Sequence, residues 1–136
     1  MNTPPQNKTL FVLDDDAIFH RIMTLANRHN AFRDITPYYN VKVLLAYLLK
    51  YRNDHKNLPD VIFVDLGIPV SDGWHFLYVY NRIYNSICKN IEIYVVTVSV
   101  NKSDNARMSA YPFVKQYITK PISMDQFRMI GKVEVY

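Results

Sequence analysis

Carboxylate side chains gather directly after two apolar segments of this chain. Asp14, Asp15 and Asp16 follow the run 9–13, and Asp65 follows the run 61–64. Carboxylates repel one another when they are brought together, and a bound divalent cation offsets that repulsion. Carboxylate oxygens and water are the ligands that Mg²⁺ prefers. The pattern therefore favours a metal site for Asp14, Asp15 and Asp65, whereas Asp16 alone is better interpreted as a helix N-cap, where a negative charge is stabilised.

Two complementary side chains end later apolar segments. Thr97 ends the run 91–97 with a hydroxyl, and Lys120 follows the run 114–119 with an ammonium group. A hydroxyl donor and a fixed cation suit the oxygens of a phosphoryl group. Either residue alone would be weak evidence, because a threonine at a strand end is usually just a β-former. Aspartates, a threonine and a lysine at four segment ends form a far more specific set.

The segments that carry these side chains alternate between strand and helix patterns five times. The expected strands are 9–13, 33–36, 61–64, 91–97 and 114–119, with Pro37 closing the second. The central runs are apolar without alternation, which indicates a mainly parallel sheet covered on both faces. In such sheets ligands bind beyond the carboxyl ends of the strands. The polar side chains described above are expected at that edge.

Apolar residues at helical spacing predict the helices between these strands. In the first helix the expected stripe is Ile18, Ile22, Leu25 and Ala26, widened by Phe19 and Met23. The second is expected over 41–49, with Asn40 as its N-cap. The third follows Gly73, a short polar helix fills 102–110, and the last is marked by Met124, Phe127 and Ile130.

Composition limits the class of protein. The 136 residues suit a domain over 9–136 after a flexible N-terminal segment over 1–8, and 49% hydrophobic residues exclude a disordered chain. The lone Cys88 excludes an internal disulfide framework. A net charge of +4 is spread along the chain without a basic cluster, so direct binding to nucleic acid is not expected. No apolar stretch could span a membrane, and a cytoplasmic location is expected.

Four segments together resemble the receiver domain of response regulators in two-component signalling systems, in its single-domain, chemotaxis-regulator-like form. They are 12–16 (VLDDD), 64–73 (VDLGIPVSDG), 95–97 (VVT) and 117–121 (YITKP). The similarity extends from about Leu10 to about Ile130. It implies an α/β fold of the flavodoxin-like (βα)5 type, a doubly wound parallel sheet with strand order 2-1-3-4-5 in a three-layer sandwich.

The resemblance also implies a phosphoacceptor and a Mg²⁺ site. Asp65 would take a phosphoryl group from a histidine kinase or a phosphotransfer protein. Asp15 would bind Mg²⁺ directly, Asp14 would bind it mostly through water, and the backbone carbonyl of Gly67 would be a further ligand. The domain would catalyse only its own phosphorylation and dephosphorylation, and it would not be a turnover enzyme.

The remaining implied roles concern the response to phosphorylation. Thr97 would bind a phosphoryl oxygen, Lys120 would pair with Asp65 and then with the phosphoryl group, and Tyr117 would be the aromatic switch. The Lys120–Pro121 bond would be cis. An effector protein would bind the face formed by about 102–110, 114–118 and 124–130.

Two positions depart from the commonest family pattern. Gly67 lacks the side chain that many relatives have two residues after the aspartate, which leaves the lifetime of the phosphoryl group open. Val98 is larger than the residue usually found after the threonine, and we hypothesise that it crowds the phosphoryl site.

Three alternatives stay open at this point. The chain could be a receiver-like interaction module that does not use phosphate, or a receiver piece of a larger regulator or hybrid kinase. A flavodoxin-like nucleotide or flavin binder is disfavoured, because three aspartates after the first strand would repel phosphate.

Overall fold

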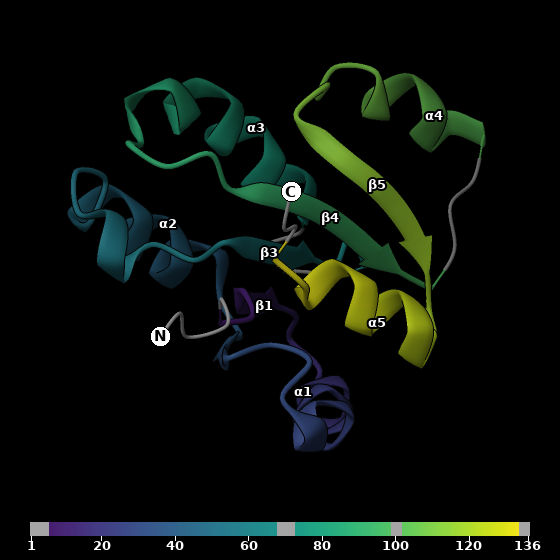
Figure 1. The fold of residues 1–136 in the computed structure, drawn as a ribbon. Coiled ribbons are helices and arrows are strands. Elements are labelled where there is room, and N and C mark those ends of the chain that lie inside the picture. Colours follow the sequence, from purple (N-terminus) through teal and green to yellow (C-terminus); the bar gives the residue numbers. More distant parts are fainter. Residues whose placement is uncertain (1–5, 68–72, 99–101, 134–136) are drawn as a thin grey trace.

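Five parallel strands form one sheet in the computed structural model, which describes residues 6–67, 73–98 and 102–133 (Figure 1). The strands are β1 (Thr9–Leu13), β2 (Asp34–Tyr38), β3 (Val61–Val64), β4 (Glu92–Thr97) and β5 (Val114–Thr119). Their order across the sheet is β2-β1-β3-β4-β5. This order and the alternation with helices confirm the predicted fold class.

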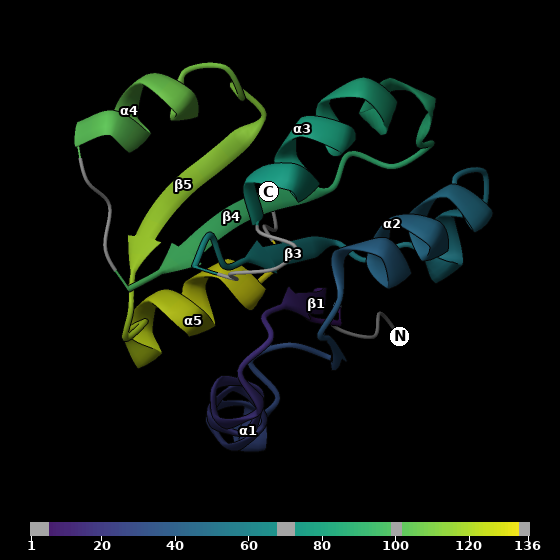
Figure 2. The ribbon, with the colours of Figure 1, turned by 180° about the vertical axis from the view of Figure 1, so that it is seen from behind.

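Helices cover both faces of the sheet. The helices are α1 (Ala17–Ala26), α2 (Val41–Lys50), α3 (Gly73–Ile83), α4 (Lys102–Met108) and α5 (Met124–Gly131). Short 3-10 turns η1 (Asn27–His29), η2 (His55–Asn57) and η3 (Tyr84–Ser86) follow α1, α2 and α3. Figures 1 and 2 show α1 and α5 on one side of the sheet and α2 and α3 on the other.

The alternation of side chains along each strand divides the core into two clusters. In β1, Leu10 and Val12 face α1 and α5, whereas Phe11 and Leu13 face α2 and α3. β3 and β4 divide in the same way, because successive residues of a strand point to opposite faces. Burial on both faces explains why these strands are apolar without alternation.

The predicted apolar stripe of α1 is confirmed for Phe19, Met23 and Ala26, which pack on the core, and is wrong for Ile18, Ile22 and Leu25. Phe19 and Met23 are the buried residues that pack on the sheet. Ile18, Ile22 and Leu25 are 69%, 50% and 61% exposed. The helix carries two apolar sets at the same i, i+4 spacing, and spacing alone cannot choose between them.

The predicted end of the second strand at Pro37 was also wrong. β2 continues through Pro37, which pairs with Val12, and ends at Tyr38. β2 lies at the edge of the sheet and pairs only with β1. A proline, which has no backbone N–H, is tolerated in an edge strand.

Residues 6–8 are attached to the domain by hydrogen bonds, while 1–5 of the segment expected to be flexible lie outside the described residues. The backbone N–H of Lys8 donates to the Gly131 carbonyl at 2.9 Å, and the Lys8 carbonyl accepts from Arg33 N–H at 2.9 Å. Within the described part of the chain, no helix has the length and apolar character needed to cross a membrane.

Candidate functional site

The backbone brings two of the predicted aspartates to the same edge of the sheet. Asp14 and Asp65 directly follow β1 and β3, whose last residues, Leu13 and Val64, are partners in the ladder. The N–H of Asp65 donates to the Leu13 carbonyl at 3.0 Å, and the N–H of Asp14 donates to the Tyr38 carbonyl at 3.0 Å. The strand ladder therefore continues to the aspartates and fixes their backbone.

Three carboxylates form a compact acidic cluster at this edge. One oxygen each from Asp14, Asp15 and Asp65 lies within 4.8 Å of the other two. Asp14 and Asp65 are buried, and Asp15 is exposed. Hard oxygen donors at this spacing, open to solvent on one side, fit a divalent cation such as Mg²⁺.

Lys120 supplies the positive charge beside this cluster. Its Nζ lies 2.7 Å from Oδ2 of Asp14 and 3.4 Å from Oδ2 of Asp65. The ammonium also lies 4.0 Å from the centre of the Phe19 ring. The backbone N–H of Lys120 donates to the Thr97 carbonyl at 2.7 Å. Lys120 thus joins the carboxyl ends of β1, β3, β4 and β5.

The Asp14 carboxyl is the group whose charge is costly in this arrangement. Burial raises its pKa above the ordinary value, and the negative charge of Asp65 acts in the same direction. The hydrogen bonds from Lys120 and from the Asp16 backbone lower the pKa but do not cancel the effect of burial. One lysine therefore leaves the acidic cluster short of positive charge.

Asp16 has a structural role, as interpreted from the sequence. Its Oδ1 accepts from the N–H of Ile18 at 2.9 Å and caps α1. Its own N–H donates to Oδ1 of Asp14 at 2.9 Å. The start of α1 therefore also orients the Asp14 carboxylate.

Thr97 and Tyr117 lie on the adjoining strands. Thr97 is buried at the end of β4, and Tyr117 is half-buried in β5 opposite Val95. The Tyr117 hydroxyl is buried without a hydrogen-bond partner among the described residues. Burial raises the pKa of Tyr117, and nearby Tyr111 contributes to the rise. The Lys120–Pro121 peptide bond is cis.

Comparison with known proteins agrees with this architecture. No family model matches the chain. Over 127 residues it is 27% identical to the transcriptional regulatory protein KdpE of Staphylococcus aureus, an alignment covering 90% of this chain and 47% of KdpE. The chain thus spans about half the length of that relative.

Solved structures give the same fold. A two-component response regulator from Cytophaga hutchinsonii superposes with a TM-score of 0.77 at 18% identity, covering 93% of this chain and 95% of that one. The Mn²⁺-bound form of response regulator Rcp1 superposes with a TM-score of 0.68 at 21% identity, and the match covers 91% of this chain and 89% of Rcp1. The phosphorylated cyanobacterial phytochrome response regulator RcpA superposes with a TM-score of 0.68 at 24% identity, and the match covers 91% of this chain and 88% of RcpA.

The chain has the fold of a response-regulator receiver domain. Two glycines lie against Asp65. The N–H of Gly67 donates to Oδ1 of Asp65 at 3.0 Å, whereas the orientation of its carbonyl toward a metal stays a prediction. A Cβ on Gly73 would lie 2.2 Å from the Asp65 carbonyl oxygen, so only glycine lets α3 begin this close to the site. Residues 68–72 of the motif, including Pro69 and Asp72, lie outside the described residues.

His20 belongs to the site, although no sequence pattern indicated it. This buried side chain lies on α1, and its Nε2 is 2.7 Å from the Asp14 carbonyl oxygen. Its ring also contacts Tyr39, with centroids 4.4 Å apart. His20 thus supports the backbone of a candidate metal ligand, a role that no spacing between histidines could reveal.

An apolar cavity of about 360 Å³ opens beside Lys120. Phe19, Ile22 and Met23 of α1 line one part of it, and Val98, Pro121 and Ile122 line another. Val98 itself is exposed. The hypothesis that Val98 crowds the phosphoryl site stays a prediction.

Proposed function

We propose that this receiver domain accepts a phosphoryl group on Asp65 from the phosphohistidine of a kinase or phosphotransfer protein. The observation that carries the proposal is the contact of Lys120 with both Asp14 and Asp65 inside the acidic cluster. A fixed ammonium beside a carboxylate nucleophile is suited to charge on a transferring phosphoryl group. Carboxylates act as such nucleophiles in aspartyl-phosphate enzymes.

The chain's own residues prepare Asp65 for this reaction. Its Oδ1 accepts from Gly67 N–H and its Oδ2 contacts Lys120, which together fix the plane of the carboxylate. A carboxylate oxygen would attack phosphorus as the bond to the donor imidazole nitrogen breaks, with the electron pair of that bond returning to the ring. The Thr97 hydroxyl and Lys120 would then bind phosphoryl oxygens.

The acidic cluster would hold Mg²⁺ through Asp14, Asp15 and Asp65, with the Gly67 carbonyl as a further ligand. Bound Mg²⁺ would neutralise charge on the phosphoryl oxygens. The similar regulator Rcp1 has a Mn²⁺-bound form, which supports a divalent cation as a ligand of a protein with this fold.

Phosphorylation would act as the signal because it changes the charge next to Lys120. An aspartyl phosphate adds roughly −1.5 to −2 charge at neutral pH, by analogy with other phosphorylated side chains. Lys120 directly follows β5, and its backbone is bonded to Thr97, so a change at the site would pass into β5 and Tyr117. Among the described residues the buried Tyr117 hydroxyl has no hydrogen-bond partner, which makes its present position costly and supports a second arrangement of this side chain.

The protein that donates the phosphoryl group would dock over the apolar cavity beside Lys120. Ile22 is half exposed at its edge, and Ile18 continues the exposed apolar face of α1 toward the acidic cluster. Such a face next to a reactive group favours contact with a protein over contact with a small metabolite.

Incubation with Mg²⁺ and acetyl phosphate, followed by intact mass measurement, tests the proposal. The wild-type chain should gain the mass of one phosphoryl group, and Asp65→Asn should gain none. Beryllofluoride with Mg²⁺ should shift the NMR signals of the site in the wild type alone. A wild-type chain that neither gains phosphate nor binds beryllofluoride would instead support the phosphate-independent interaction module.

A further inference from the structure

The ammonium group of Lys120 is in contact with an aromatic ring as well as with two carboxylates. Its Nζ is 2.7 Å from Oδ2 of Asp14 and 3.4 Å from Oδ2 of Asp65, and it lies over the Phe19 ring at 4.0 Å from the ring centre. The Lys120 side chain is 15% exposed, so these groups replace most of the water around it. The carboxylates belong to the acidic cluster, and the ring is an additional neighbour that carries no charge.

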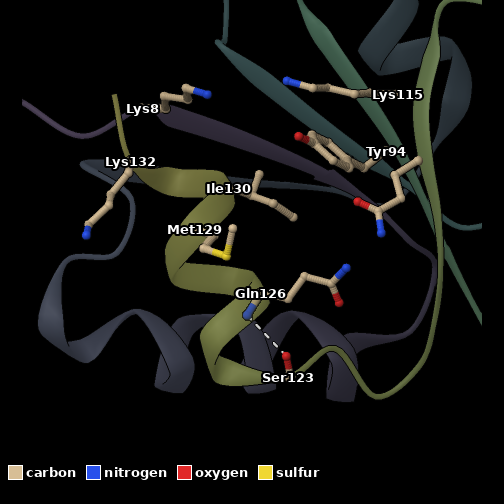
Figure 3. A pocket seen from close by; sticks show the side chains of 9 residues that line it. Lys8, Tyr94, Lys115, Ser123, Gln126, Met129, Ile130 and Lys132 are labelled. Carbon is tan, nitrogen blue, oxygen red and sulfur yellow. Dashed lines mark hydrogen bonds between the residues drawn. The ribbon is translucent and has the colours of Figure 1, made fainter. Parts of the chain in front are cut away.

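The backbone near Lys120 is fixed by hydrogen bonds on both sides of the residue. Its own N–H donates to the Thr97 carbonyl at 2.7 Å. Farther along the chain, the Ser123 hydroxyl accepts from the N–H of Gln126 at 3.1 Å and caps α5 (Figure 3). The lysine side chain nevertheless has a long flexible stem, so a fixed backbone does not fix the ammonium. The position of the ammonium therefore depends on the groups that surround it.

The Phe19 ring is itself held in place by the core and by the start of α1. It is buried and packs in the cluster between the sheet and the helices α1 and α5. Asp16 caps α1, and its N–H donates to Oδ1 of Asp14 at 2.9 Å. The turn into α1 therefore positions both the ring and one of the carboxylates that contact the ammonium.

The contact between this ring and Lys120 depends on aromatic character. A cation over an aromatic ring is attracted by the negative face of the ring, and the attraction is stronger where water is excluded. Phe19 lines the apolar cavity beside Lys120 together with Met23 and Ile122, so the contact lies in apolar surroundings. An aliphatic side chain at position 19 would also be apolar, but it would not attract the charge.

We propose that Phe19 is a positioning residue for phosphoryl transfer, whose ring holds the Lys120 ammonium beside Asp65 and shields it from water. The inference rests on the proposed function of Asp65 and adds a residue of α1 that would act only through Lys120. Attraction to the face of a ring has no fixed hydrogen-bond direction. The ammonium can therefore shift from Asp14 toward a phosphoryl oxygen while it stays over the ring.

Two changes at position 19 test the inference. Phe19→Leu removes the ring, and a fluorinated phenylalanine at the same position keeps the shape of the ring but weakens its negative face. Both should slow phosphorylation of the full chain by acetyl phosphate with Mg²⁺, the leucine variant about tenfold and the fluorinated chain to a smaller extent. A ring that only fills space predicts no change in the fluorinated chain, which also decides the question if Phe19→Leu does not fold.

NMR of the full chain locates Lys120 without any phosphoryl transfer. In the metal-free wild type, the ring current of Phe19 should shift the ε-methylene protons of Lys120 upfield, and Phe19→Leu should abolish this shift. Beryllofluoride with Mg²⁺ should leave most of the shift in the wild type. A shift that disappears when beryllofluoride binds would overturn the inference, because the ammonium would then leave the ring when it meets a phosphoryl group.

Phe32→Leu is the matched control, because Phe32 is a buried ring of the same core cluster that packs against Phe63 and Phe127. This variant should be phosphorylated at the wild-type rate. Wild-type rates in both chains changed at position 19, or equal slowing in Phe32→Leu and Phe19→Leu, would overturn the inference and leave Asp65 as the acceptor. A wild-type chain that gains no phosphate would overturn the proposed function and this inference with it.

Discussion

Nζ of Lys120 donates to Oδ2 of Asp14 across 2.7 Å, although the two residues are 106 positions apart in the sequence. The shorter of the two contacts that Lys120 makes is thus with a candidate metal ligand, and the contact of 3.4 Å is with the proposed phosphoacceptor Asp65. The lysine therefore links the metal side of the site to the phosphoryl side.

Asp14→Asn should stabilise the metal-free protein at pH 7. Burial raises the pKa of Asp14 in the folded state, so the folded state favours its protonated form. The protonated Asp14 carboxyl therefore stabilises the folded state at pH values below the pKa that Asp14 has in the unfolded chain. This stabilisation is lost as the pH rises through the pKa that Asp14 has in the folded protein. We expect the variant to melt a few degrees higher than wild type at pH 7 with EDTA.

The same comparison at pH 3 gives the control for Asp14→Asn. Both proteins then carry a neutral group at position 14, so the difference in melting temperature should disappear. Mg²⁺ should raise the melting temperature of the wild type and have little effect on the variant. A variant that melts below wild type at pH 7 would show that the Lys120 contact outweighs the cost of burial.

Gly73→Ala should destabilise the domain, although alanine is normally the better helix former. The added Cβ would lie 2.2 Å from the Asp65 carbonyl oxygen, which is backbone and cannot turn away. We expect a loss of about 2 kcal/mol in the free energy of unfolding. Urea denaturation measures it, and a variant as stable as wild type would contradict the close approach of α3 to the site.

Ile22→Asp should slow phosphoryl transfer from a protein donor but not from a small-molecule donor. Ile22 is half exposed at the edge of the cavity beside Lys120, so its loss removes apolar contact with a docked protein. Transfer from the phosphorylated kinase or phosphotransfer protein should slow about tenfold, equivalent to about 1.4 kcal/mol. Phosphorylation by acetyl phosphate should be unchanged. Equal slowing with both donors would indicate damage to the site itself, and Leu25→Asp, farther along the same exposed face, is the matched control.

Val98→Ala tests whether the valine crowds the phosphoryl site. Val98 lines the cavity that opens beside Lys120, so a smaller side chain would widen the approach for donors and for water. Phosphorylation by acetyl phosphate and spontaneous loss of phosphate should both speed up severalfold. If both rates match those of the wild type, the crowding hypothesis fails.

The fold was predictable because each of four apolar strands ends at, or just before, a polar or charged side chain. Apolar runs end at Asp14, Asp65, Thr97 and Lys120, and in a parallel sheet such ends meet at one edge. β1, β3 and β5 therefore have the bounds that the sequence indicated.

What the sequence could not decide depends on contacts between distant elements. Ile22 and Met23 are equally apolar, and only packing on the sheet buries the second and leaves the first half exposed. The role of His20 also depends on the folded structure, because only the turn between β1 and α1 brings its ring to the Asp14 carbonyl. Lys8 and Lys115 meet at Glu92 only because β1, β4 and β5 are parallel.

The most direct test of the account is to locate the phosphorylated residue. The chain would be incubated with acetyl phosphate and Mg²⁺, reduced with borohydride to convert the acyl phosphate to homoserine, and digested for mass spectrometry of the peptides. We expect homoserine at position 65 alone, and none when Mg²⁺ is removed with EDTA. Modification at Asp14 or Asp15 with position 65 unchanged would contradict the assignment of Asp65 as the phosphoacceptor.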